Sequence, residues 1–276
     1  MTHTTMNINH CHYLDRISTT ARQAGAAIMQ IYERDFDVQH KGDGSPLTEA
    51  DLAAHHLICR QLADMSPDLP ILSEESRDIP YEERSGWQRY WLVDPLDGTK
   101  EFVNRNGEFT VNIALIENGK PVLGVVYAPV MDILYTGCDG VATMQVEDGP
   151  SEEISVKPFS GDNPCLVASR SHAGEALTAA IERLCDRFDD IDILSMGSSF
   201  KLCLVAEGRA DLYPRLGLTS EWDTAAAHAI VTAAGGRVTT LNGENLCYNK
   251  ENLLNPWFLV SNGQYDWLSI INEPDR

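Results

Sequence analysis

Apolar residues recur every three or four positions in two segments of the first quarter of the chain, which predicts two amphipathic helices. The first is expected over residues 13–32, where Leu, Ile and Ala share one face. The second is expected over residues 48–63, because Thr48 is a good N-cap and Asp51 follows three residues later, as in a capping box. Gly and Pro in residues 41–46 predict a loop between them.

Shorter apolar runs follow and predict an antiparallel sheet. The expected strands are residues 70–73, 90–94, 109–117, 122–130 and 133–136. The third and fourth form a long hairpin, since Asn118-Gly119 between them favours a tight hairpin turn.

Residues 140–163 are polar, acidic and rich in Gly and Pro, and we place a boundary between two lobes there. Beyond it, strand and helix patterns alternate, as expected for a partly parallel sheet covered by helices. The expected strands are residues 165–169, 192–196, 210–213, 237–239 and 257–261, and the expected helices are residues 174–188, 198–207 and 222–234. The pattern predicts an α/β layered protein with an N-terminal α+β lobe, residues 1–150, and a C-terminal α/β lobe, residues 151–276.

The net charge of the chain limits the classes of ligand that it is expected to bind. It has 276 residues, 43% of them hydrophobic, a formal net charge of −20 and a pI near 4.6. Such acidity argues against nucleic acid as a ligand, because binding to phosphate backbones rests on Lys and Arg. A phosphorylated substrate would need a bound cation or a locally reversed field.

The cysteines and the apolar runs bear on location. The seven cysteines are widely spaced and include no C-x-x-C, so we expect neither a disulfide framework nor a zinc knuckle, and a reducing compartment fits best. Residues 1–11 are polar, so no secretory signal is expected. His3, His10, Cys11 and His12 could bind a metal, but a loose polar tail is the favoured interpretation of this segment. Without about 18 consecutive apolar residues, no transmembrane helix is expected.

Two carboxylates mark the end of an apolar strand. Asp94 and Asp97 stand three residues apart, with Pro95 unable to continue a sheet and Gly98 permitting a tight turn. Together with the Leu96 carbonyl they offer the hard oxygen ligands that Mg²⁺ prefers. For this pair alone, an Asp-rich turn is the simpler interpretation.

Further acidic residues shift the interpretation from an Asp-rich turn toward a metal site. Glu74 follows another strand-like run, and Asp223 begins a predicted helix, where its charge also favours the helix dipole. Asp51 likewise has a structural explanation as a capping residue. Several carboxylates that meet in one place repel one another unless cations neutralise them, so two or three Mg²⁺ ions are predicted.

Four motifs resemble the inositol monophosphatase superfamily of Mg²⁺-dependent, lithium-sensitive phosphatases. In order they are Lys41-Gly42-Asp43-Gly44-Ser45-Pro46-Leu47-Thr48-Glu49-Ala50-Asp51, Leu72-Ser73-Glu74-Glu75, Trp91-Leu92-Val93-Asp94-Pro95-Leu96-Asp97-Gly98-Thr99 and Glu221-Trp222-Asp223-Thr224-Ala225-Ala226. Lys100-Glu101-Phe102 is similar to the bacterial 3′(2′),5′-bisphosphate nucleotidase branch. The resemblance covers residues 13–268 and implies an α/β/α/β/α layered sandwich, with an antiparallel sheet in the N-terminal lobe and a mixed, partly parallel sheet in the C-terminal lobe.

The resemblance also implies roles for individual residues. The metal ligands would be Glu74, Asp94, the Leu96 carbonyl, Asp97 and Asp223. Thr99, helped by Asp51 or Glu74, would orient the attacking water, so these three are the catalytic candidates. The substrate contacts would be Glu74, Leu96, Asp97, Gly98, Thr99, Gly197, Ser198, Ser199, Lys201 and Asp223. For Lys201 a solvated helix lysine remains an alternative, and for Arg170 and Arg215 surface positions remain an alternative to binding a second phosphate.

The expected reaction is in-line attack of a metal-activated water on the 3′-phosphate of adenosine 3′,5′-bisphosphate, which gives AMP and phosphate and belongs to sulfur assimilation. Alternatives are an inositol monophosphatase, a sugar-bisphosphate phosphatase and a non-catalytic metal- or nucleotide-binding regulator. The expected location is cytoplasmic, with peripheral association with the inner membrane and the oligomeric state left open.

Overall fold

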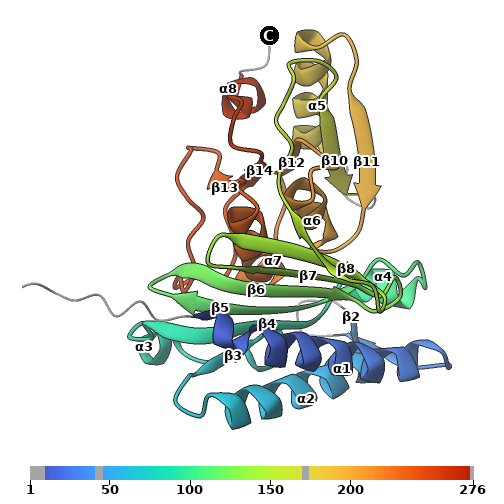
Figure 1. Cartoon of the computed structure of the whole chain (residues 1–276), viewed down its shortest axis with the longest axis vertical. Coiled ribbons are helices and arrows are strands. Elements are labelled where there is room, and N and C mark those ends of the chain that lie inside the picture. The colour runs from blue at the N-terminus through green and yellow to red at the C-terminus, as the bar shows by residue number, and fades with distance from the viewer. Residues whose placement is uncertain (1–9, 41–45, 170–173, 274–276) are drawn as a thin grey trace, which may run out of the picture.

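The computed structural model describes residues 10–40, 46–169 and 174–273 and shows five stacked layers (Figure 1). A helical pair covers one face of a seven-stranded sheet, and a second helical layer separates this sheet from a five-stranded one. Two more helices cover the far face of the five-stranded sheet. The α/β/α/β/α expectation is therefore confirmed.

The large sheet carries its strands in the order β3-β4-β5-β6-β7-β8-β9. β3 and β4 are parallel, whereas the other neighbouring pairs are antiparallel. The bounds are β3 Ile71–Ser73, β4 Arg89–Asp97, β5 Thr110–Glu117, β6 Lys120–Ala128, β7 Ile133–Cys138, β8 Val141–Val146 and β9 Ser151–Ile154. The predicted hairpin is confirmed, with Asn118 and Gly119 both at positive φ (50° and 73°), as this turn requires.

The first helical layer consists of α1 (Leu14–Tyr32) and α2 (Glu49–Met65). Their apolar faces bury residues such as Ile17 and Ile58 against Trp91 of β4. The short helix η1 (His10–Tyr13) precedes α1, and the ribbon β1 (Val38–His40) and β2 (Pro46–Thr48) precedes α2. Both predicted helices are thus confirmed within about two residues.

The inner helical layer consists of α6 (Phe200–Ala206) and α7 (Glu221–Ala233), which pack between the two sheets. Small residues let α7 approach the large sheet closely. A Cβ at Gly124 would lie 2.1 Å from the Ala226 carbonyl oxygen, and one at Gly137 would lie 2.5 Å from Ile230 Cα. These contacts hold the middle of α7 against the large sheet.

The small sheet has the strand order β11-β10-β12-β14-β13, in which β10 is parallel to β11 and β12 while β14 is antiparallel to its neighbours. The bounds are β10 Cys165–Ser169, β11 Asp192–Met196, β12 Leu212–Arg215, β13 Arg237–Thr240 and β14 Phe258–Ser261. Helices α5 (Glu175–Arg187) and α8 (Trp267–Ile271) cover it. The remaining short helices are η2 (Glu74–Ser76), α3 (Tyr81–Arg84) and α4 (Thr99–Val103).

The irregular segment predicted at residues 140–163 contains strands β8 and β9. Asp139 and Gly140, at φ 47° and 82°, form the turn that leads into β8. Glu152 and Glu153 are exposed on the edge strand β9, and such edge charges gave this region a loop-like composition. The predicted lobe boundary at residue 150 falls between these two strands.

The expectation that the cysteines form no disulfide is wrong for one pair. Cys11 and Cys138 are bonded, with Cα atoms 5.9 Å apart although the two residues stand 127 positions apart in sequence. Spacing could not reveal the pair because only the folded sheet and η1 bring the two residues together. His10 and Cys11 accordingly belong to η1 rather than to a loose tail, whereas His3 lies outside the described residues.

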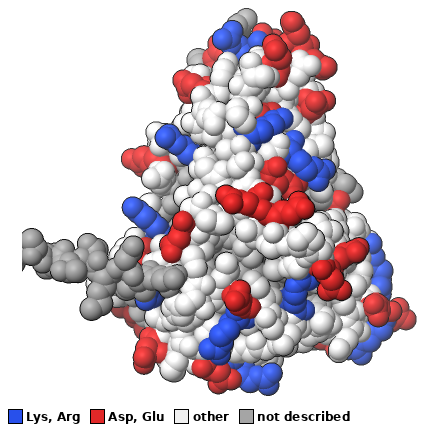
Figure 2. Space-filling model, in the orientation of Figure 1, with Lys and Arg blue, Asp and Glu red and all other residues white. Residues whose placement is uncertain are grey.

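Two surface properties complete the description. Acidic and basic side chains are interspersed over one face of the molecule, so acidic groups are not confined to the interior (Figure 2). Among the described residues, no helix is long and apolar enough to cross a membrane.

Candidate metal centre and substrate cavity

Three carboxylates from distant parts of the sequence converge between the two sheets. Asp94, Asp97 and Asp223 each present an oxygen within 4.8 Å of the others. The first two end β4, and the third lies in the first turn of α7. The close packing of α7 on the large sheet therefore completes the cluster.

The bend that carries Asp94 and Asp97 is shaped locally. The pairing of β4 with β5 is regular up to Asp94 and irregular between Asp94 and Asp97, because Pro95 lies between them and has no N–H to donate. The Leu96 N–H instead donates to Asp94 Oδ1 at 3.1 Å. Gly98 follows at φ 92°, a conformation that favours glycine.

Glu74 joins the cluster through the parallel pairing of β3 with β4. Ser73 of β3 is in register with Val93 of β4, and Glu74, the first residue of η2, and Asp94 of β4 are the next residues along these two segments. The Glu74 charge, and a hydrogen bond between the two side chains, contribute to the raised pKa of Asp94. The predicted convergence of Glu74 with Asp94 is thus present.

Asp223 has two roles. Its Oδ2 accepts the Ser220 N–H at 2.9 Å in a capping box at the start of α7. The structural and metal-binding interpretations are therefore compatible, because a carboxylate has more acceptor sites than one cap uses.

The electrostatics of the cluster fit a divalent cation. Burial, and then Glu74, raise the pKa of Asp94 well above its usual range, while burial and Asp97 do the same for Asp223. Burial raises the pKa of Asp97 to about 6, although Lys201 opposes this shift. Buried carboxylates that repel one another and carry free lone pairs are the donor set that Mg²⁺ uses.

Asp51 and Thr99 lie beside the cluster as the sequence predicted. Thr99 Oγ1 is 3.3 Å from Asp51 Oδ1 and 3.4 Å from the Leu96 carbonyl oxygen. Asp51 Oδ2 accepts the Thr48 N–H at 2.8 Å and so caps α2. One oxygen of Asp51 therefore fixes the helix and the other faces the site.

Sequence reasoning missed Thr110 and Asn112 beside Asp97, and it gave Ser199 only as a substrate contact. Its Oδ2 accepts the Ser199 N–H at 2.6 Å and lies 3.4 Å from Asn112 Nδ2. The Ser199 hydroxyl is within 2.8 Å of both Asn112 and Thr110. The signal was present in the sequence, since Thr110 and Asn112 are polar residues on one face of an otherwise apolar strand.

Two backbone N–H groups in the segment before α6 already donate to carboxylates, so they are not open to a phosphate as predicted. The Gly197 N–H donates to Glu108 Oε2 at 2.7 Å, and Ser199 is buried with its N–H on Asp97. Gly197 lies so close to Glu108 that a Cβ would be 2.8 Å from its carbonyl oxygen. This segment therefore joins the two halves of the site.

A cavity of about 140 Å³ opens next to the carboxylates. Its lining includes Asp97, Gly98, Glu101, Ser169, Gly197, Ser198, Lys201, Tyr213, Arg215, Thr219 and Asp223. The predicted contacts Gly98, Gly197, Ser198 and Lys201 are thus brought together, whereas Arg170 and residues 41–45 of the first motif lie outside the described residues.

Two cationic residues, Lys201 and Arg215, line this cavity together with Asp97 and Asp223. Lys201 is buried, donates to the Ser198 carbonyl at 2.5 Å and lies 5.8 Å from the Tyr213 ring centre. Burial lowers the pKa of Lys201 to about 8. Arg215 Nη2 donates to the Leu218 carbonyl at 2.7 Å, and its buried Nε has no hydrogen-bond partner. Ser198 Oγ is also buried without a partner, at a residue with φ 45°. The cavity therefore offers unused donors to an anion.

The chain is similar to known proteins along most of its length. A profile of the inositol monophosphatase family matches residues 12–265. The 3′(2′),5′-bisphosphate nucleotidase CysQ of Escherichia coli K12 is 52% identical over 252 residues, which cover 90% of this chain and 99% of that protein. The protein of the same name from Haemophilus influenzae is 36% identical over 261 residues, covering 94% and 96% of the two chains.

A solved structure agrees with these matches. The crystal structure of CysQ from Bacteroides thetaiotaomicron superposes with a TM-score of 0.80 at 42% sequence identity, covering 92% of this chain and all of the other. It is described as a bacterial member of the inositol monophosphatase family.

Proposed function

The chain belongs to the inositol monophosphatase family, and we propose that it is a Mg²⁺-dependent phosphatase that converts adenosine 3′,5′-bisphosphate to AMP and phosphate. The 52% identity to a 3′(2′),5′-bisphosphate nucleotidase over nearly the whole chain supports this substrate class. The observation that carries the proposal is the convergence of Asp94, Asp97 and Asp223 within 4.8 Å, beside a cavity that Lys201 and Arg215 also line.

We propose that two or three Mg²⁺ ions bind this cluster. Their ligands would be the carboxylates of Glu74, Asp94, Asp97 and Asp223 and the carbonyl oxygen of Leu96. When bound, such ions lower the pKa of water and neutralise charge that develops on a transferring phosphoryl group.

The protein's own groups position the reactants. Thr99 Oγ1, held between Asp51 and the Leu96 carbonyl, is placed to accept or donate a hydrogen bond to the attacking water. Asp51 is the proton acceptor behind it, because its Oδ1 faces Thr99 while its Oδ2 is anchored to α2. Gly98 and Thr99 begin α4, where backbone N–H groups can bind phosphate oxygens.

The cations of the cavity suit a second phosphate. Lys201 and Arg215 both line the cavity beside Asp97 and Asp223. A bisphosphate placed with its 3′-phosphate at the carboxylates and its 5′-phosphate toward these residues would meet charges of the right sign at both ends. An inositol monophosphate has no second phosphate to meet them.

Phosphate release from adenosine 3′,5′-bisphosphate and inositol 1-phosphate, side by side and with and without Mg²⁺ and Li⁺, tests the proposal. We expect Mg²⁺-dependent, Li⁺-inhibited release that is at least about tenfold faster, as kcat/KM, for the nucleotide. Lys201→Gln should raise KM for the bisphosphate and leave KM for adenosine 3′-monophosphate nearly unchanged. Faster turnover of inositol 1-phosphate would show that the substrate is wrong, and release without any divalent ion would show that the mechanism is wrong.

We also propose a cytoplasmic location. Five of the seven cysteines are free, and Cys185 and Cys247 among them are exposed, as is common in reducing compartments. Cell fractionation tests this location and shows whether part of the protein accompanies the inner membrane.

A further inference from the structure

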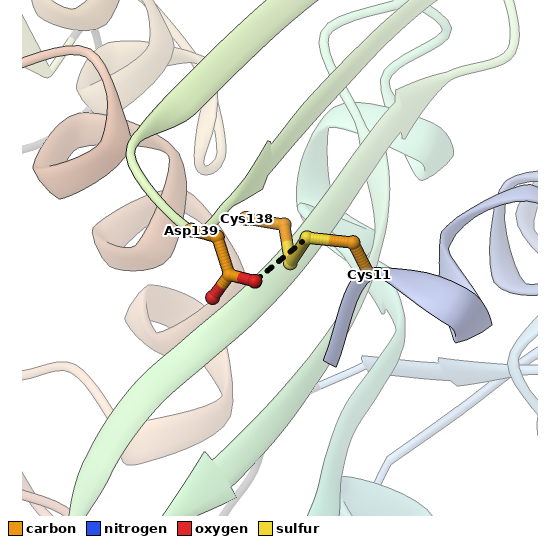
Figure 3. Close-up of side chains that lie close together, drawn as sticks. All are labelled: Cys11, Cys138 and Asp139. Carbon is orange, nitrogen blue, oxygen red and sulfur yellow. Dashed lines mark hydrogen bonds between the residues drawn. A yellow bond between two sulfur atoms is a disulfide. The ribbon is translucent and has the colours of Figure 1, made fainter. Parts of the chain in front are cut away.

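We propose that Cys11 and Cys138 form a thiol–disulfide exchange site whose oxidation locks η1 and the start of α1 onto the large sheet and whose reduction releases them. The bond joins the helix η1 to the last residue of β7 (Figure 3). This role is independent of the phosphatase reaction.

The contrast with the other cysteines argues for exchange rather than a permanent structural bond. All seven cysteines lie in the described residues, and five of them are free, two of these being exposed. In compartments where exposed thiols remain reduced, protein disulfides are usually transient and redox-sensing. The Cys11–Cys138 pair is therefore the one that folding places within bonding distance, in a chain that otherwise keeps its thiols.

The two sulfurs are unequally accessible, as an exchange site requires. Cys138 is only 3% exposed, whereas Cys11 is half-buried. Both residues line an open cavity of about 590 Å³ between α1 and strands β7 and β8. A small thiol that enters this cavity would attack Cys11 Sγ and leave Cys138 as the buried thiol.

Asp139 sets the charge at this entrance. Its Oδ2 lies 3.3 Å from Cys11 Sγ, so it can accept a hydrogen bond from the reduced Cys11 thiol (Figure 3). A carboxylate at this distance also repels anionic thiolates that approach the same sulfur. Asp139 therefore favours the reduced pair and slows exchange with anionic thiols.

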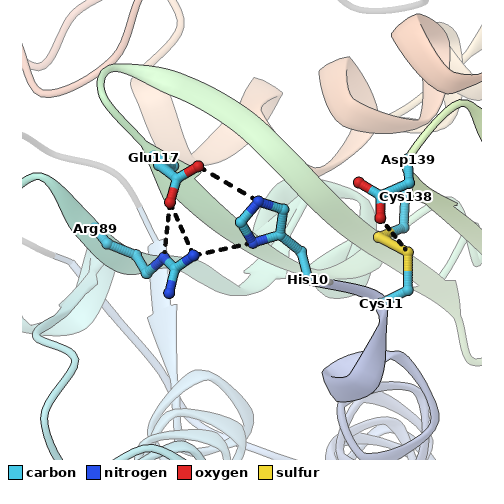
Figure 4. The surroundings of a disulfide bond; sticks show 6 residues. All are labelled: His10, Cys11, Arg89, Glu117, Cys138 and Asp139. Atoms are coloured by element: carbon cyan, nitrogen blue, oxygen red, sulfur yellow. Dashed lines mark hydrogen bonds and ion pairs between the residues drawn. A yellow bond between two sulfur atoms is a disulfide. The ribbon is translucent and has the colours of Figure 1, made fainter. Parts of the chain in front are cut away.

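The bond acts on a segment that polar and aromatic contacts also hold to the sheet. His10 lies 3.1 Å from Arg89 and 3.4 Å from Glu117, which are themselves joined at 2.8 Å (Figure 4). Tyr13 packs edge-on against Trp91 at 5.4 Å. The ion pair between Arg89 and Glu117 is partly exposed and contributes little by itself, whereas a bond between residues 127 positions apart restricts the unfolded chain strongly.

The exchange site is separate from the metal centre. Cys138 pairs with Leu123, and the same row continues through Leu115 to Trp91, three residues before Asp94. Cys138 and Asp94 are also three strands apart, which is about 14 Å at the usual strand spacing. Redox changes should therefore alter the docking of η1 without directly touching the phosphatase residues.

The chemistry is a two-electron exchange. In the forward direction, the Cys11 thiolate attacks a low-molecular-weight disulfide such as oxidised glutathione, forming a mixed disulfide and releasing one glutathione thiolate. The Cys138 thiolate then attacks Cys11 Sγ and displaces the second. The two protein thiols are oxidised, the glutathione disulfide is reduced to two thiols, and the two protein protons pass to the released thiolates or to solvent.

The test equilibrates the full chain in glutathione buffers of graded ratio and measures the Cys11–Cys138 bond by alkylation and mass spectrometry, together with hydrogen exchange. We expect the bonded fraction to change with the glutathione ratio while the protein stays folded. Amide exchange over residues 10–17 should be about tenfold faster in the reduced protein, while exchange in α2 remains unchanged. Cys11→Ser should show the fast pattern under all conditions, and the matched control Cys185→Ser should behave like the parent chain.

Two results would overturn the proposal. One is a bond that persists in the folded protein under millimolar reduced glutathione, which would make it a permanent structural link. The other is identical hydrogen exchange in both redox states. The role of Asp139 has its own test, because Asp139→Asn should raise the rate of reduction by glutathione, relative to that by dithiothreitol, by about threefold, since the glutathione thiolate carries one more negative charge. An unchanged ratio would overturn the role of Asp139.

Discussion

Asp51 and Thr99 meet at 3.3 Å although 48 residues separate them in sequence, and the same aspartate caps the helix from which it projects. Its two oxygens have different partners, since Oδ2 is bonded to Thr48 while Oδ1 faces the metal centre. A residue that sequence alone explains as a helix cap is therefore also positioned for proton transfer.

The variant Asp51→Asn separates these two roles. The amide can still accept from the Thr48 N–H, but it cannot take a proton, so kcat should fall by about 10² or more. Thr48→Ala is the matched control, since it weakens the cap by about 1 kcal/mol while leaving the carboxylate. We expect this control to lower the thermal midpoint and to keep kcat within about threefold. Equal losses of kcat in the two variants would mean that Asp51 acts only through the helix.

The buried carboxylate of Asp94 should destabilise the protein when no metal is bound. Its folded-state pKa is raised by burial and by Glu74, so its favourable contribution is present at low pH and is lost as pH rises through that pKa. At neutral pH, Asp94→Asn should therefore raise the thermal midpoint of the metal-free protein and still reduce Mg²⁺-dependent phosphate release by about 10³ or more.

Asp64→Asn, at an exposed position in α2, is the charge-matched control and should change neither quantity. Scanning calorimetry in EDTA and a phosphate-release assay measure the two effects. A lower midpoint for Asp94→Asn in EDTA would contradict the argument from electrostatic repulsion.

Mg²⁺ binding should be linked to proton release. Below about pH 6 the metal-free protein holds a proton on Asp97. The pKa values of Asp94 and Asp223 are also raised, so these two carboxyl groups keep their protons at pH values where an ordinary aspartate is ionised. Because the ion displaces these protons, its apparent affinity should fall as pH falls, by about tenfold per pH unit for each proton displaced.

Isothermal titration calorimetry in two buffers of different ionisation enthalpy measures the number of protons released. Asp97→Asn should release fewer protons than the parent chain at about pH 6. Binding heats that do not depend on the buffer would rule out this linkage.

His228 provides a pH-dependent contribution to stability outside the cluster. It is buried in α7 beside the Tyr248 hydroxyl at 2.9 Å, and burial lowers its pKa to about 3. The unfolded chain binds this proton near pH 6.5, so the folded state loses stability as pH falls below that value, by about 2 kcal/mol between pH 8 and pH 5. The carboxylates with raised pKa act in the opposite direction, so only a comparison isolates the histidine.

His228→Gln supplies that comparison. Its free energy of unfolding should depend less on pH than that of the parent chain, and urea denaturation at several pH values measures the difference. Parallel curves for the two proteins between pH 8 and pH 5 would exclude a buried neutral histidine.

Elements of this fold that depend on near neighbours in sequence were predictable. The helix at residues 14–32, the Asn118-Gly119 hairpin and the Thr48–Asp51 capping box were all predictable, because each depends on neighbours within a few residues. Strand β9 escaped detection since its exposed edge residues, Glu152 and Glu153, are as polar as those of a loop. The contacts that Ser199 makes with Asp97 and Asn112 also escaped, because they join residues about 90 to 100 positions apart.

The sequence by itself determined the local elements, the bend at Asp94-Pro95-Leu96-Asp97 and, through its motifs, the candidate metal ligands. Only the tertiary structure decided that Asp223 reaches Asp94 and Asp97, that Lys201 and Arg215 share one cavity with them, and that Cys11 finds Cys138. The physical reason is the distance along the chain over which each kind of interaction acts. Propensities, caps and turns act over a few residues along the chain, whereas these contacts arise from the packing of α7 and η1 on the large sheet, which depends on the whole apolar core at once.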